Sequence, residues 1–148
     1  MTLQNLVKIG LLHEHRTSPP EIGRLLASAD RNLADAEIQE VSAENRFDAA
    51  YKSIMQAALI AIIANGFRPS TSQPGHHQTL VQSLPRTLGL DSSTVVVLDA
   101  LRKKRNVADY EGDPVSESEL AECLVQARAL LPRLRAWLRE NRPDLLPQ

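Results

Sequence analysis

Leu98, Leu101, Arg105 and Ala108 are the residues whose spacing first suggests a site, because they follow one another by three, four and three positions. This spacing puts all of them on one face of a helix, so Arg105 stands where the pattern predicts an apolar side chain. A guanidinium group there is costly unless a carboxylate, a phosphate or a wet cleft receives it. Asp109, one helical turn further on, could pair with it. Arg105 is therefore the first candidate for a ligand-binding residue.

The residues just before Arg105 make the most basic stretch of the chain: Arg102, Lys103 and Lys104. Cations at the C-terminal part of a helix oppose the helix dipole favourably, which explains these three side chains without a ligand. The dipole accounts less well for Arg105. Arg102 remains a second candidate for ligand binding.

His76 and His77 follow Gly75 at the end of a polar stretch. Adjacent helical residues point about 100° apart, so this pair would not chelate one metal ion as an i, i+4 pair would. We expect the two histidines to cap or begin a helix. If the fold brought either of them close to Arg105, it could supply a general base. No metal-site motif, phosphate-cradling glycine loop or cofactor motif is present in the sequence.

The composition is that of a globular protein whose core is aliphatic. Of its 148 residues, 43% are hydrophobic, 24% charged and only 3% aromatic, and the net charge is −1. A core of Leu, Ile, Val and Ala favours helix-on-helix packing. The near-zero net charge leaves nucleic-acid binding to a local patch. Neither a membrane span nor a leader is expected, and we predict a cytoplasmic protein without a membrane partner.

Apolar periodicity, caps and Pro/Gly breaks predict an all-α fold, an up-down antiparallel bundle of four to five main helices in one domain, 1–148. The third segment opens at Ser42 and ends at Gly66, and Ser116 with Glu119 forms a capping box. A turn-rich loop is expected at 68–75. The expected helices are 3–15 as an N-terminal appendage, 21–36, 42–65, 76–88, 94–110 and 116–138.

The segment Leu101-Arg-Lys-Lys-Arg105-Asn106-Val-Ala-Asp109-Tyr110 resembles the signature helix of HEPN domains (higher eukaryotes and prokaryotes nucleotide-binding). The long apolar helix before it, the Gly66 break and the final Leu-rich helix follow the order of that family. The resemblance covers about residues 20–140. It implies a four- or five-helix bundle that dimerises and brings two Arg-containing helices together in a cleft.

In active HEPN members that cleft cuts RNA without metal: the Arg holds the phosphate, and a His four to six residues later moves protons. Here Tyr110 stands five residues after Arg105, and no His follows it. A phenol with a pKa of about 10 is a poor general base at neutral pH. The resemblance thus implies that Arg105 binds phosphate, that Asn106 is its motif neighbour, and that Tyr110 occupies the His place without its chemistry.

The leading hypothesis is a catalytically degenerate HEPN-like homodimer that binds a nucleotide, RNA or a protein through a cleft around Arg105, Asn106, Asp109 and Tyr110. Some relatives pair with a small nucleotidyltransferase and carry adenylate on a Tyr, so Tyr110 could be such an acceptor. Its simpler interpretation is a ring packed at a helix end. One alternative is a metal-independent endoribonuclease of a toxin–antitoxin system, using Arg105 with Tyr110 or a histidine. Another is a structural module whose Leu120–Leu138 stripe docks a partner helix.

Overall fold

Two stretches of the chain, residues 2–72 and 75–146, are described by the structure, a computed structural model. Within them the chain is mostly helical, so the predicted all-α class is confirmed. The elements in chain order are α1 (Leu3–Lys8), β1 (Leu12–Glu14), α2 (Pro19–Ala36), α3 (Ala43–Ala64), β2 (Phe67–Pro69), α4 (His76–Thr87), α5 (Ser92–Glu111), α6 (Glu117–Asn141) and the 3-10 turn η1 (Pro143–Leu145).

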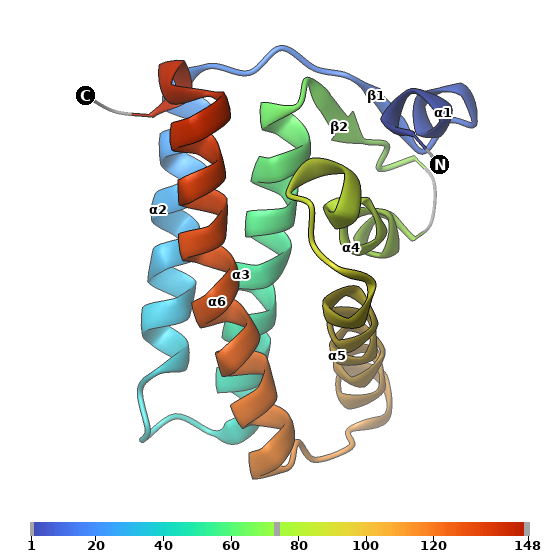
Figure 1. Cartoon of the computed structure of the whole chain (residues 1–148). Helices are drawn as coiled ribbons and strands as arrows, with labels where there is room; N and C mark the ends of the chain where they lie inside the picture. The colour runs from blue at the N-terminus through green and yellow to red at the C-terminus, as the bar shows by residue number, and fades with distance from the viewer. Residues whose placement is uncertain (1, 73–74, 147–148) are drawn as a thin grey trace.

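The long helices α2, α3, α5 and α6 alternate in direction along the chain, and α4 crosses them (Figure 1). α3 lies at the centre and packs most extensively against α2 and α6. α3 and α6 run the same way, because α4 and α5 come between them in the sequence. β1 and β2 form a short antiparallel pair beside α1 at one end of the bundle.

α3 is the most buried helix, as its broad apolar face predicts. Ala50, Ala57, Ala58 and Ala61 are all 0% exposed, and such small side chains let neighbouring helices approach closely. The helix is long and apolar enough to cross a membrane, but 72% of its apolar window is buried inside the bundle. That burial is the pattern of a core helix.

The predicted start and end of α3 and the predicted start of α6 are confirmed. Ser42 accepts a hydrogen bond from the Asn45 backbone N–H at 3.2 Å, and Gly66 follows the C-cap with a φ of +95°, which a side chain would strain. At the start of α6, Ser116 accepts from Glu119 N while the Glu119 carboxylate accepts from Ser116 N. These reciprocal bonds satisfy two backbone donors that the first helical turn leaves unpaired.

We expect Ser116→Ala to lower the free energy of unfolding by about 1 kcal/mol, because the Ala side chain cannot accept the Glu119 N–H. Urea denaturation followed by circular dichroism measures the loss. Ser116→Asn is the matched variant, since its side-chain oxygen can still accept the Glu119 N–H and Asn is among the best N-cap residues. A loss in Ser116→Asn equal to that in Ser116→Ala would mean that the capping bond does not stabilise α6.

The N-terminal prediction is wrong beyond the first helical turns. α1 ends at Lys8 rather than at residue 15, since Gly10 takes a φ of +82° and reverses the chain. Residues 12–14 form β1, in which Leu12 is 2% exposed and pairs with Pro69. The predicted loop at 68–75 is likewise shortened, because Arg68 and Pro69 belong to β2. The apolar spacing could not reveal this pairing, which joins segments more than fifty residues apart.

The predicted helices 21–36, 76–88 and 94–110 agree with α2, α4 and α5 to within two residues at each end, whereas the predicted helix 116–138 stops three residues before the end of α6 at Asn141. The Leu-rich stripe of α6 is buried in the core of this chain, so it is not a free surface for a partner helix. Its buried members are Leu120, Leu124, Leu131, Leu134 and Leu138.

Candidate functional site: a pocket around Arg105

Three helices contribute to one pocket that contains Arg105. The pocket has a volume of about 430 Å³ and is lined by Tyr51 from α3, His76 and His77 from α4, and Arg105 from α5. The histidines do begin a helix, as expected, since α4 starts at His76. The start of α4 also places both histidines in the same pocket as Arg105. A histidine must lie in that pocket if it is to act together with Arg105.

Arg105 is held by two carboxylates and an aromatic ring. Its Nε lies 2.8 Å from Asp109 Oδ2 on the next turn of α5 and 3.4 Å from Asp48 Oδ1 on α3. Its Cζ lies 5.5 Å from the centroid of the Tyr51 ring, within the range of a cation–π interaction. The side chain stays 29% exposed. The predicted pairing with Asp109 is thereby confirmed, and Leu98 and Leu101 on the same face are buried.

Both carboxylate contacts of Arg105 are made by Nε, on one edge of the guanidinium group. A ligand would therefore meet the group at its two terminal nitrogens. Planar N–H donors of this kind match the oxygens of a phosphate or a carboxylate. The two aspartates also fix the position of the guanidinium before a ligand arrives, at the cost of partly neutralising its charge.

Tyr51 and His77 form a pair inside the pocket. Tyr51 Oη lies 3.1 Å from His77 Nδ1, and Tyr51 is only 2% exposed. Burial raises the pKa of Tyr51 to about 12, although the nearby Arg105 and Arg102 charges oppose that rise. The phenol therefore stays protonated at neutral pH.

The pKa of His77 is lowered from its ordinary value, chiefly by burial and then by the charges of His76, Arg105 and Arg102. A histidine with a lowered pKa is neutral at pH 7. The pocket thus places a neutral imidazole beside a permanent cation. A neutral imidazole can donate one hydrogen bond or accept a proton, and its tautomer decides which nitrogen does so.

The rest of the pocket has polar, charged and apolar parts. Lys52 and Arg68 add two cationic side chains, although Arg68 lies 3.6 Å from Glu21. Asp48 adds a carboxylate, and the apolar wall comes from Met55, Leu59 and Leu80. A few polar groups beside an apolar wall are the usual make-up of a small-molecule site. This arrangement can hold an anionic group near Arg105 and an organic portion against the wall.

The other residues predicted around Arg105 do not line this pocket. Arg102 binds Asp99 through Nε at 2.8 Å, and Asn106 is half-buried on α5. Tyr110 is 84% exposed, so its interpretation as a packed ring is wrong. Tyr110 lies in the last turn of α5, between Asp109 and Glu111, which are exposed as well.

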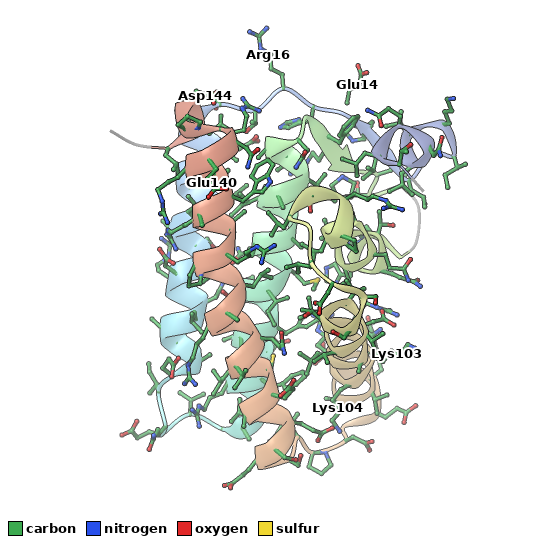
Figure 2. The ribbon with its side chains drawn as sticks, in the orientation of Figure 1. Glu14, Arg16, Lys103, Lys104, Glu140 and Asp144 are labelled. Carbon is green, nitrogen blue, oxygen red and sulfur yellow. The ribbon has the colours of Figure 1, made fainter. Side chains whose placement is uncertain are left out.

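The basic run is paired within the chain rather than free. Lys103 lies 3.4 Å from Asp99, and Lys104 lies 3.5 Å from Glu119 and donates to the Pro114 carbonyl. Figure 2 shows Lys103 on the outer side of α5, whereas Lys104 lies between α5 and the start of α6, where Glu119 is. Paired charges of this kind attract nucleic acid less than the sequence alone suggests. Of the four cations from Arg102 to Arg105, Arg105 is the one that lines the pocket described above.

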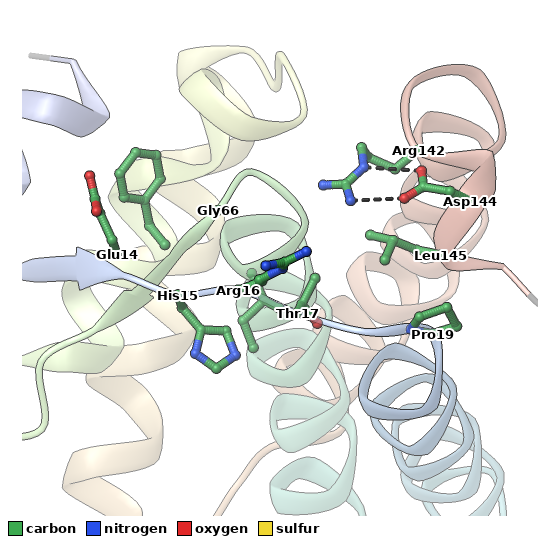
Figure 3. Close-up of a pocket in the computed structure, with 11 residues that line it drawn as sticks. Glu14, His15, Arg16, Thr17, Pro19, Gly66, Arg142, Asp144 and Leu145 are labelled. Atoms are coloured by element: carbon green, nitrogen blue, oxygen red, sulfur yellow. Dashed lines mark hydrogen bonds and ion pairs between the residues drawn. The ribbon is translucent and has the colours of Figure 1, made fainter.

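A second, wider pocket of about 600 Å³ lies at the other end of α3, between the β-pair and the start of α2 (Figure 3). Several of its polar groups already bind each other. Arg142 bonds to Asp144 through Nε and Nη2 and donates to the Ala64 carbonyl at 2.7 Å through Nη1. This arginine caps the end of α3.

Glu21, at the start of α2, ties this end of the bundle together. Its Oε1 accepts from Thr17 Oγ1 at 2.6 Å and lies 2.8 Å from His15 Nε2, while Oε2 lies 3.6 Å from Arg68. The Thr17 hydrogen bond is the largest of the effects that lower the pKa of Glu21, and His15 and Arg68 add to it against the effect of burial.

The lowered pKa of Glu21 predicts acid destabilisation. The ionised Glu21 carboxylate stabilises the folded state fully above its unfolded-state pKa, near 4.5. This stabilisation is lost as the pH falls through the lower pKa that Glu21 has in the folded state. Urea denaturation at about pH 6, 4 and 3 measures this effect. The free energy of unfolding should fall more steeply with decreasing pH for the wild type than for Glu21→Gln. Identical slopes would show that this carboxylate is not linked to folding.

Within the described ranges no three His, Cys, Asp or Glu side chains gather closely enough to hold a metal ion. Cys123, the single cysteine, is buried in the core, which raises its pKa to about 12. A thiol in that state is a poor nucleophile. The ionisable side chains that line the pocket are those of its Asp, Arg, His, Tyr and Lys residues.

No known protein-family model matches the chain, and no curated protein matches it in sequence.

Sequence reasoning missed Tyr51, Asp48, Lys52 and Arg68 as pocket residues. Tyr51 lies in the apolar stripe of α3, and its ring is part of the core. Its hydroxyl was the available signal, because a buried phenol needs a hydrogen-bond partner from elsewhere in the chain.

Proposed function

We propose that the pocket around Arg105 binds a phosphate-bearing ligand, a nucleotide or a segment of RNA, and that the chain is a HEPN-like bundle. The observation that carries the proposal is the convergence of Arg105 and a neutral His77 on one partly apolar pocket. The guanidinium would bind the phosphate oxygens, and the wall of Met55, Leu59 and Leu80 would contact the base or sugar.

The resemblance of the Leu101–Tyr110 segment to the HEPN signature adds to this proposal, since Arg105 is the residue to which that family gives the phosphate. Following the resemblance, we further propose that two copies associate, with the pocket near the contact between them. The 84% exposure of Tyr110 suits an acceptor of adenylate from a nucleotidyltransferase partner. A cytoplasmic location fits such ligands.

The direct experiment titrates the purified protein with a fluorescently labelled single-stranded RNA, and with adenosine monophosphate and inorganic phosphate as competitors. The proposal predicts saturable binding that weakens as salt rises and competition by both small phosphates. If neither RNA nor a small phosphate binds at low salt, the proposed function is wrong.

A metal-independent endoribonuclease is the second candidate, and the position of His77 favours it. With Tyr110 outside the pocket, His77 is the residue that could take the proton from a ribose 2′-hydroxyl. That oxygen would then attack the phosphorus, the 5′-oxygen would leave with a proton, and a 2′,3′-cyclic phosphate would remain. Arg105 would hold the phosphate during the transfer.

RNA cleavage in EDTA by the wild type, Arg105→Ala and His77→Gln separates this candidate from simple binding. Cleavage that both substitutions abolish would establish an enzyme, and growth arrest on expression would then be expected of a toxin. Binding without cleavage would leave the first proposal in place and exclude the second.

A further inference from the structure

The hydrogen bond between Tyr51 and His77 decides which nitrogen of the imidazole is available to a ligand. Tyr51 comes from the middle of α3 and is 2% exposed, whereas His77 lies in the first turn of α4 and is half-buried. The Oη–Nδ1 distance of 3.1 Å joins them. In this geometry either the hydroxyl donates to Nδ1, or Nδ1–H donates to the hydroxyl oxygen.

The surroundings favour the hydroxyl as donor. The phenol is buried, and its hydroxyl hydrogen needs an acceptor, since an unsatisfied buried donor is costly. His77 Nδ1 is the acceptor that the structure places next to it. If Nδ1 carried the hydrogen instead, Nδ1–H would donate to Tyr51 Oη. The phenol hydrogen would then have to find another acceptor.

Arg105 strengthens the same choice. Its guanidinium carbon lies 5.5 Å from the Tyr51 ring centroid, and a cation over the ring makes the phenol a better donor. The phenol nevertheless keeps its hydrogen, because burial raises the pKa of Tyr51 to about 12. A lone pair on Nδ1 beside a permanent cation and a protonated phenol is therefore the stable arrangement.

We propose that Tyr51 is a positioning residue that fixes neutral His77 as the tautomer with hydrogen on Nε2, so that His77 donates to an oxyanion of the ligand. The inference rests on the proposed function for the identity of that ligand, a phosphate group. It adds that the phosphate receives hydrogen bonds from two sides, the terminal nitrogens of Arg105 and Nε2–H of His77. An Nε2 that carries hydrogen cannot take a proton from a ribose hydroxyl, so this tautomer favours binding over cleavage.

The test is long-range ¹H–¹⁵N correlation spectroscopy of ¹⁵N-histidine-labelled protein without any ligand, at a pH where His77 is neutral. Wild type should show one tautomer of His77, with a protonated Nε2 and an unprotonated Nδ1. Tyr51→Phe, which removes only the hydroxyl, should move the Nδ1 signal and admit the second tautomer. A wild-type His77 with hydrogen on Nδ1, or a Tyr51→Phe spectrum identical to that of the wild type, would overturn the proposal.

Adding inorganic phosphate to the same samples separates this inference from the proposed function. The inference expects the Nε2 signal of wild-type His77 to shift on binding, while Nδ1 stays in place. If phosphate binds without moving Nε2, His77 is not a donor to it and the inference fails, while the proposed function, binding of phosphate by the protein, stands. The ligand-free tautomer stands or falls independently of whether phosphate binds, and a thermal melt of Tyr51→Phe checks that the variant is folded.

Discussion

Arg105→Ala is expected to weaken the binding of RNA or a small phosphate at least about tenfold, because a hydrogen bond to a charged group contributes about 1.5–3 kcal/mol. The substitution removes the terminal guanidinium nitrogens from the pocket. It also leaves Asp48 and Asp109 unpaired beside the anion, which adds like-charge repulsion. Arg105→Lys keeps the charge without the planar donors and should give an intermediate affinity. Fluorescence anisotropy with labelled RNA measures all three proteins.

Lys103→Ala is the matched control for this series. It removes one positive charge from the same helix, at a side chain that is 70% exposed and outside the pocket. We expect its affinity to differ from that of the wild type by less than about twofold, since exposed ion pairs contribute little. If Lys103→Ala weakened binding as much as Arg105→Ala, the interaction would be a general attraction to α5 and not recognition by the pocket.

Leu134→Ala is expected to lower the free energy of unfolding by about 2–5 kcal/mol. Leu134 is 0% exposed on α6, the helix that packs along α3. Truncation removes buried apolar surface and leaves a cavity, because the alanine-rich side of α3 can close it only in part. Urea denaturation followed by circular dichroism gives the change directly, with the m-value showing that the transition remains two-state.

Val125→Ala is the control on the same helix, since Val125 is 50% exposed. Its free energy of unfolding should stay within about 0.5 kcal/mol of the wild-type value. A loss at Val125 that matched the loss at Leu134 would mean that α6 does not bury the face described above. A small loss at Leu134 would contradict the central packing of α3 and α6.

The helices of the bundle could be predicted because their signals are local. Ser42, Gly66 and the Ser116–Glu119 capping box each act within one turn of chain, so the sequence around them is sufficient. The β-pair could not be predicted, because Leu12 and its partner Pro69 are separated in the sequence by α2 and α3. A three-residue strand has too short a pattern to be told from a helix end.

The site was predictable at Arg105 and not at its partners. The misplaced cation on an apolar face is a local signal, and so is its pairing with Asp109. Tyr51 and His77 reach the same pocket through the packing of α3, α4 and α5, which no spacing in the sequence encodes. Tyr110 was placed in the site by its position in the HEPN-like segment. In the structure it lies in the last turn of α5 and is exposed to solvent.

The central claim is that Arg105, Tyr51 and His77 form one phosphate-binding site. The most direct measurement is NMR chemical-shift mapping during titration with inorganic phosphate, read at the Arg105 Nε–H, the His77 ring and the surrounding backbone amides. The claim predicts that these signals move together along one binding curve while the signals of Arg16 and Arg142, in the pocket at the other end of α3, stay in place. Shifts confined to that second pocket, or none at Arg105 and His77, would contradict it.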